Sequence, residues 1–175
     1  MRVIDPWRST ALGVNRGGGA SVFRFEPAGR RLGLRNLRMN ARMLTGRCLC
    51  GAVAYAVPDE FLYAACCHCS NCRRTTGSAF KPFAGIEREK LTLTKGHGDL
   101  LILGEDRGND THCKACGSLL YSVVREGAYV HVAMGTLADA PTLRPSKHIF
   151  VGSKAPWFTI ADGLPQFEEH AIAET

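Results

Sequence analysis

Short apolar segments separated by turn residues recur along the chain from residue 52 onward. They are rich in Val, Tyr, Leu and Ile, and glycine, proline and aspartate lie between nearly all of them. This spacing is typical of antiparallel sheet proteins, and no segment keeps a helical period over about twelve residues. We therefore expect a mostly β fold, with a short helical turn within residues 71–78. The expected strands cover residues 52–57, 61–65, 91–94, 100–103, 119–124, 129–134 and 149–151.

The first 42 residues differ from the others in charge. They contain nine arginines, no lysine and two acidic residues, a net charge of +7, so residues 43–175 carry −1 of the chain's +6. With three consecutive glycines at 17–19 and no sustained apolar period, this Arg-rich extension (residues 1–42) is predicted to be disordered. Three interpretations are open: a translated stretch ahead of a true start at Met43, an organelle transit-like peptide, and an arm that binds polyanions.

Residues 43–175 are expected to form one globular domain. The chain is 45% apolar and 22% charged, and no stretch approaches the roughly 18 apolar residues of a membrane span. The first thirty residues lack the apolar core of a secretory signal. Because the domain is nearly neutral, it lacks the basic face of a nucleic-acid-binding domain. We expect a cytoplasmic protein without a membrane partner and without nucleic acid on its core domain.

The eight cysteines form three clusters between positions 48 and 116. In a chain without a secretory signal, thiolates spaced two and three residues apart are more typical of metal ligands than of disulfides. Tetrahedral thiolate sites suit zinc, and an iron–sulfur cluster is the main alternative. The clusters read CLCG at 48–51, CCHCSNC at 66–72 and CKACG at 113–117.

The first and third clusters together predict a closed metal site. The two cysteines of the first cluster project to the same side of an extended segment. A tight turn separates those of the third, and Gly51 and Gly117, which follow the two clusters, permit positive φ. Such a site contributes about 10–16 kcal/mol of apparent binding free energy to folding. The predicted ligands of this structural zinc are Cys48, Cys50, Cys113 and Cys116.

The second cluster predicts an open metal site. Cys67, Cys69 and Cys72 supply three thiolates within six residues, and no fourth cysteine follows at a comfortable spacing. Three protein ligands with an open fourth position are typical of a catalytic zinc. We expect these three cysteines to hold a zinc ion that binds an incoming thiol and lowers its pKa.

Two other interpretations of the second cluster are open. A fourth ligand from Cys66, His68 or His112 would make it a second structural site. A redox switch would instead use the vicinal pair Cys66 and Cys67.

Several residues outside the clusters are candidates for substrate binding or packing. Arg73, Arg74 and Lys81 follow the second cluster and could meet the carboxylates of a substrate, with solvated surface as the alternative. Trp157 and Phe158 are assigned to the core.

The cysteine clusters and the C-terminal segment resemble the glutathione-dependent formaldehyde-activating enzyme family, which also includes centromere protein V. The resemblance covers residues 43–175 in order, and the Arg-rich extension has no counterpart in it. It rests on four motifs: GRCLCGAVAY at 46–55, CCHCSNCRRTTGSAF at 66–80, CKACGS at 113–118 and SKAPWFTIADGLPQFE at 153–168.

This resemblance implies a tent-like zinc-binding fold of short antiparallel sheets with two zinc ions per chain. The structural zinc would lie on the first and third clusters and the catalytic zinc on the second. The implied activity is that of a zinc-dependent carbon–sulfur lyase of the S-hydroxymethylglutathione synthase type, with glutathione or another thiol as substrate. The alternative is a zinc-stabilised binding or redox-responsive module without catalysis, whose Arg-rich extension contacts a partner.

Overall fold

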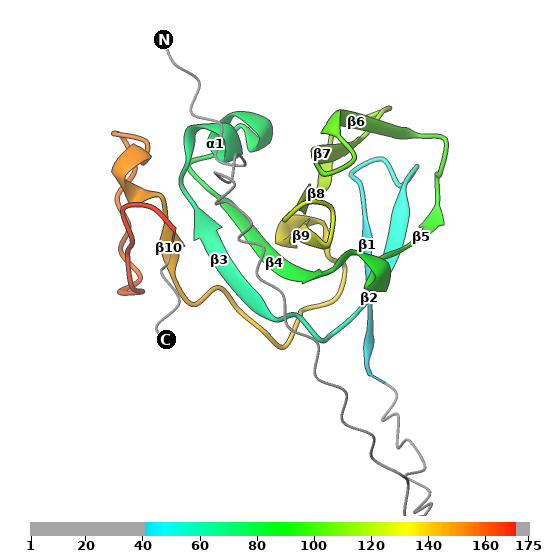
Figure 1. Ribbon diagram of the computed structural model, residues 1–175, viewed down its shortest axis with the longest axis horizontal. Coiled ribbons are helices and arrows are strands. Elements are labelled where there is room, and N and C mark those ends of the chain that lie inside the picture. Colours follow the sequence, from blue (N-terminus) through cyan, green and yellow to red (C-terminus); the bar gives the residue numbers. More distant parts are fainter. Residues whose placement is uncertain (1–40, 171–175) are drawn as a thin grey trace, which may run out of the picture. The chain divides into compact units, whose positions relative to one another are not determined.

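A computed structural model describes residues 41–170 of the chain, which form two sheets (Figure 1). The smaller sheet has three antiparallel strands in the order β1-β2-β5. Its strands are β1 (Met43–Arg47), β2 (Ala54–Pro58) and β5 (Thr92–Lys95). The predicted disorder of residues 1–42 lies outside the described residues, except at positions 41 and 42.

The larger sheet has seven strands in the order β10-β3-β4-β9-β8-β7-β6. All neighbouring strands are antiparallel except β10 and β3, which run parallel at one end of the sheet. In Figure 1 the segment that follows β10 lies on the side of β10 that faces away from β3. The strands are β3 (Tyr63–Cys67), β4 (Lys81–Glu87), β6 (Leu100–Glu105), β7 (Gly108–Cys113), β8 (Leu119–Val124), β9 (Tyr129–Ala133) and β10 (His148–Ile149).

The helices are short. The α-helix α1 (Ser70–Thr76) follows β3 almost directly and ends at Gly77, which has a φ of 62° and donates its backbone N–H to the carbonyl of Arg73. Glycine adopts this left-handed conformation without steric cost. Three 3₁₀ helices complete the fold: η1 (Arg88–Lys90), η2 (Met134–Thr136) and η3 (Val151–Ser153). No helix within residues 41–170 has the length and hydropathy needed to cross a membrane.

The main core lies on one face of the larger sheet. Side chains alternate between the two faces of a strand, and Ile86, Val130 and Val132 are fully buried with Leu44 and Val57 from the smaller sheet. Full burial of one such side chain contributes about 1.5–3 kcal/mol.

The opposite face of the larger sheet carries a second, smaller apolar cluster. It contains Ala65, Cys67, Phe83 and Ile149. The second cysteine cluster therefore lies on the face of the larger sheet that does not form the main core.

The mostly β architecture confirms the prediction, and each of the seven expected segments contains a strand. At 149–151 the strand is shorter, because only Ile149 is extended and η3 begins at Val151. The sequence did not indicate β1, β4 or β7. β7 was missed because its buried side chains are polar: Thr111 donates its hydroxyl to the Asn109 side-chain oxygen at 2.9 Å.

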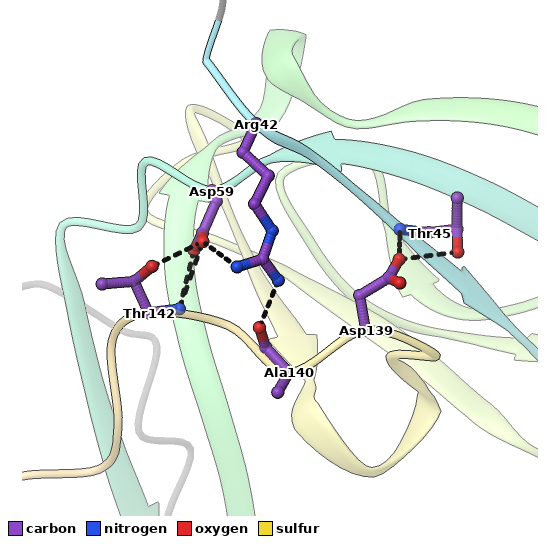
Figure 2. Close-up of polar contacts among 6 residues, drawn as sticks. All are labelled: Arg42, Thr45, Asp59, Asp139, Ala140 and Thr142. Atoms are coloured by element: carbon purple, nitrogen blue, oxygen red, sulfur yellow. Dashed lines mark hydrogen bonds and ion pairs between the residues drawn. The ribbon is translucent and has the colours of Figure 1, made fainter.

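Carboxylates join the first strand to the loop that follows η2 (Figure 2). Asp139 accepts hydrogen bonds from the backbone N–H of Thr45 at 2.7 Å and from its hydroxyl at 2.9 Å. Asp59 accepts from the Thr142 hydroxyl at 2.7 Å and lies 3.6 Å from the guanidinium of Arg42. Arg42, which the sequence analysis placed in the Arg-rich extension, therefore contacts the globular domain.

Candidate metal centres

The first and third cysteine clusters meet in the structure. Cys48 and Cys50 follow β1 of the smaller sheet, whereas Cys113 ends β7 of the larger sheet and Cys116 lies three residues beyond it. The four sulfur atoms all lie within 4.8 Å of one another. These residues, the four-cysteine site, therefore connect the two sheets.

The sulfur spacing fits a tetrahedral metal ion of the size of zinc. A zinc–sulfur bond of about 2.3 Å gives sulfur–sulfur edges of about 3.8 Å in a regular tetrahedron. The Sγ atoms of Cys48 and Cys50 are 3.6 Å apart, and those of Cys50 and Cys113 are 3.8 Å apart. The four cysteines that the sequence analysis grouped could hold a metal ion with little rearrangement.

Local turns and hydrogen bonds shape the four-cysteine site. Gly51 and Gly117, one after each pair of cysteines, have φ values of 73° and 75°, which favour glycine. The Ser118 hydroxyl lies 3.3 Å from the Cys116 sulfur. This hydroxyl and the Ser118 backbone N–H lower the pKa of Cys116 to about 5, so its thiolate is favoured. Cys50 is exposed, and solvent reaches the site there.

The second cluster lies at the junction of β3 and α1. Cys67 is the last residue of β3, Cys69 is the N-cap of α1, and Cys72 lies in its first turn, where its backbone N–H donates to the Cys69 sulfur at 3.4 Å. The three sulfurs lie within 4.8 Å of one another, and none of these residues is exposed. They also could hold a metal ion and are called the three-cysteine site.

The thiols of the three-cysteine site influence one another's ionisation. Hydrogen bonds from the thiols of Cys67 and Cys72 lower the pKa of Cys69 to about 2 despite burial. The same contacts raise the pKa of Cys67, because it is the donor. One negative charge at Cys69 is thus stabilised by its two neighbours even before a cation binds.

Two of the three candidate fourth ligands lie away from the three sulfurs. Cys66 and His68 alternate with Cys67 and Cys69 along an extended segment, so their side chains point to the other face. The Nε2 atom of His68 lies 2.8 Å from Nδ1 of His148. Burial lowers the pKa of His68 to about 4, with a further contribution from His148, so the ring is neutral at pH 7.

The third candidate, His112, connects other elements. Its Nδ1 atom lies 3.0 Å from the Gly117 carbonyl, and its Nε2 atom lies 3.2 Å from the Thr75 hydroxyl of α1. Among residues 41–170, the group that could hold a metal ion at the three-cysteine site therefore consists of these three cysteines.

The structure gives no support to a redox pair of Cys66 and Cys67. Cys66 is 6% exposed, and its pKa rises to about 11 through burial and the charge of Asp162. A buried thiol with a raised pKa reacts slowly, because the thiolate is the nucleophile.

The three predicted substrate contacts occupy different environments. Arg74 is exposed on α1, and Arg73 is half-buried, with an Nε atom that has no hydrogen-bond partner among the described residues. Lys81, the first residue of β4, is only 4% exposed and donates from Nζ to the Ser122 hydroxyl at 2.8 Å. Ser122 in turn donates to a carboxylate oxygen of Asp110 at 2.5 Å.

Two aromatic assignments have different outcomes. Trp157 is 72% exposed, so its assignment to the core is wrong. The loop of 154–158 is held by Lys154, which donates to the Phe158 carbonyl at 2.5 Å, and this closed turn directs Trp157 outward. Phe158 is half-buried beside His68 and Phe80, with ring centroids 6.0 and 5.4 Å away.

Sequence reasoning missed a chain of polar contacts behind His68. His148 places Nε2 3.0 Å from the Asp162 carboxylate, and its other ring nitrogen faces His68. His68 and His148 are 80 positions apart in the sequence, and His148 and Asp162 are 14 positions apart. The only local signal was the apolar segment around Ile149, which indicated a strand but not what its neighbouring histidine contacts.

Comparisons with known proteins identify a family and structural relatives. The model of the family described as glutathione-dependent formaldehyde-activating enzyme matches residues 43–153, which include all seven cysteines of the two sites. No curated protein matches. A crystal structure of a Rhodobacter sphaeroides protein matches with 27% identity over 56% of this chain and 91% of that chain, with a TM-score of 0.46.

Proposed function

Because the chain belongs to the glutathione-dependent formaldehyde-activating enzyme family, we propose that it is a zinc-dependent carbon–sulfur lyase. It joins a thiol such as glutathione to formaldehyde, or to a related carbonyl compound, and cleaves the adduct in the reverse direction. One observation carries the proposal: Cys67, Cys69 and Cys72 lie together without a fourth protein ligand among the described residues.

The two sites have different proposed roles. The four-cysteine site offers a complete tetrahedral ligand set, so its zinc is structural. Zinc held by Cys67, Cys69 and Cys72 would supply a positive charge at an open position, which favours the thiolate form of a bound thiol. The thiolate chemistry of both sites suits zinc better than a hard, oxygen-preferring cation.

Arg73 and Arg74 are the proposed contacts for the carboxylates of the thiol substrate. Both lie on α1, immediately after Cys72, so they flank the cluster on the element that carries two of its ligands. The buried Nε of Arg73 is a donor without a partner among the described residues. A guanidinium forms paired hydrogen bonds with a carboxylate, which would fix the orientation of the substrate.

The proposed step is an addition without oxidation or reduction. The thiol proton leaves, the sulfur attacks the carbonyl carbon, and a carbon–sulfur bond forms. The electron pair of the carbon–oxygen double bond moves to oxygen, which takes up a proton. The product is a hydroxymethyl thioether, and the reverse sequence releases thiol and aldehyde.

The Cys69→Ala variant of the full chain tests this proposal. Exchange between glutathione, formaldehyde and their adduct is followed by two-dimensional exchange NMR, with the spontaneous rate subtracted. The wild type should accelerate the exchange, and C69A should not, although it remains folded. Cys66→Ala is the matched control, because Cys66 is a neighbouring buried cysteine outside the three-cysteine site. Full acceleration by C69A would contradict the proposal.

A further inference from the structure

Lys81 is a buried cation on the face of the sheet that carries the three-cysteine site. Its side chain is 4% exposed, although lysine is almost never fully buried without a partner. Nζ donates to the neutral hydroxyl of Ser122, and the Asp110 carboxylate is one hydrogen bond further away. Among the described residues, no carboxylate forms an ion pair with Lys81 directly.

The strand register places Lys81 beside the cluster. Lys81 of β4 lies directly opposite Cys67 of β3 in the antiparallel pair. Directly opposite residues share one face, with Cβ atoms about 4.5–5.5 Å apart. α1, which carries Cys72, also packs against β4.

The positive charge of Lys81 lies beside the thiols of the three-cysteine site. A nearby positive charge favours the thiolate form of a cysteine. Lys81 is therefore placed to stabilise ionised ligands.

A three-cysteine site that held a divalent metal ion would carry a negative charge, which Lys81 could compensate. Three thiolates and one divalent cation carry a net charge of −1, and a buried, uncompensated charge is costly. None of the three cysteines is exposed, whereas Cys50 exposes the four-cysteine site to solvent. A fourth thiolate from a substrate would bring the charge of the three-cysteine site to −2.

We propose that Lys81 is a positioning residue that supplies the compensating positive charge for the three-cysteine site. It stabilises the metal-bound thiolates and favours the ionised form of an incoming thiol. The second part rests on the proposed function, whereas the first concerns metal retention alone. Lys81 thus acts on the ligands from within the sheet, rather than as a contact for substrate carboxylates.

Zinc release from the full chain tests this role without any substrate. Excess chromogenic chelator removes zinc in phases, and the phase that is missing in C69A belongs to the three-cysteine site. In Lys81→Met, which keeps the length of the side chain but not its charge, this phase should be about 10–100-fold faster, as for other residues that support metal ligands. The phase of the four-cysteine site should be unchanged.

Three variants separate charge from packing. Lys81→Arg keeps the charge and should restore slow release. Ser122→Ala removes the hydrogen bond but leaves the charge, so its release should stay within a few-fold of the wild type. Lys90→Met is the matched control, because Lys90 is a surface lysine paired with Glu60 and Glu87.

Three results would overturn the role of Lys81. These are wild-type release in K81M, equal acceleration of both phases, and S122A releasing zinc as fast as K81M. If K81M does not fold, Lys81→Gln is judged by the same criteria. Because the assay contains neither glutathione nor formaldehyde, its outcome is independent of whether the proposed lyase activity exists.

Discussion

The two cysteine sites consist of the same type of residue, but their cysteines are distributed differently along the chain. The ligands of the four-cysteine site come from segments 63 positions apart, measured from Cys50 to Cys113, and from different sheets. Those of the three-cysteine site come from residues 67–72, at one strand–helix junction. A metal ion in the first site closes a long loop, whereas one in the second orders only a few residues. Ligand separation therefore supports the proposal that the first site holds the fold together and that the second is free to react.

The surroundings of the two sites differ as well. The four-cysteine site is built into the main core through Cys48 and Cys113, which are 1% and 0% exposed. Glycine turns and the Ser118 hydroxyl support its remaining ligands. The three-cysteine site lies on the other face of the larger sheet, beside the buried Lys81. It is also near Arg73, whose Nε has no hydrogen-bond partner among the described residues.

The largest expected contrast comes from removing one ligand of the four-cysteine site. Cys113→Ser should lose the native fold, because it breaks the link between the sheets and forfeits much of the roughly 10–16 kcal/mol that structural zinc binding contributes. Circular dichroism during heating and zinc analysis measure the effect, with Cys66→Ser as the control. A C113S protein that melts with the wild type would remove the distinction between the sites.

The equivalent change at the three-cysteine site should leave the fold intact. Cys69→Ala is expected to keep its sheet structure and to lower the zinc content from two ions per chain to one, because its neighbours then offer only two thiolates. Elemental analysis and circular dichroism on the same sample measure both effects. Unfolding of C69A to the extent seen for C113S would show that both sites are structural.

Glycines near each site provide a finer comparison. Gly117 and Gly77 have φ values of 75° and 62°, and an added Cβ meets nothing within 4 Å at either position. Alanine should therefore cost about 1–2 kcal/mol of unfolding free energy at both, through backbone strain alone. Only Gly117→Ala should accelerate zinc release from the four-cysteine site. Equal release from both variants would contradict the local role of Gly117.

Acid should destabilise the face that carries the three-cysteine site through His131. Burial, with the charges of Lys81 and Arg125, lowers its pKa to about 3, against about 6.5 when unfolded. The unfolded chain therefore takes up the proton first, and stability present above pH 6.5 is lost as the pH falls towards 3. The slope reaches about 1.4 kcal/mol per pH unit.

Urea unfolding at pH 7 and pH 5.5 measures this effect. His131→Phe should lose less stability than the wild type between the two pH values, and any zinc lost in acid affects both proteins. Equal losses would exclude His131 as the cause.

The smallest effect is expected at the carboxylate that holds the first strand. Asp139 lies on an exposed loop, and Asp139→Ala removes its two hydrogen bonds with Thr45 of β1 (Figure 2). This should cost about 0.5–1.5 kcal/mol of unfolding free energy. Urea unfolding measures the loss. Zinc release from the four-cysteine site, three residues beyond Thr45, should change little, because Cys48 is fixed by the core. A large acceleration would mean that the loop, and not the core, holds this site.

The sequence predicted the cysteine grouping because ligand spacing is a local property. Cys67, Cys69 and Cys72 are close in the chain, and the paired spacings at Cys48 and Cys113 are typical of metal ligands. Strands with large apolar residues were also predictable, because they alternate regularly.

The environment of the three-cysteine site could not be predicted in the same way. β4 contains lysine, proline and glycine, which weaken its strand pattern. Without β4, nothing in the sequence places Lys81 opposite Cys67 or within reach of Ser122, 41 positions away. Lys81 therefore resembled a surface contact for substrate, and only the structure shows that it is buried opposite Cys67.

The most direct test asks whether the three-cysteine site accepts a thiol. Cobalt replaces zinc in the full chain and in C69A, and glutathione is titrated while the thiolate-to-cobalt charge-transfer absorption is recorded. This absorption grows with the number of thiolates bound to the metal. The wild type should show a saturable increase, and C69A, which retains only the four-cysteine site, should show none. An unchanged wild-type spectrum would contradict an open site that binds thiols.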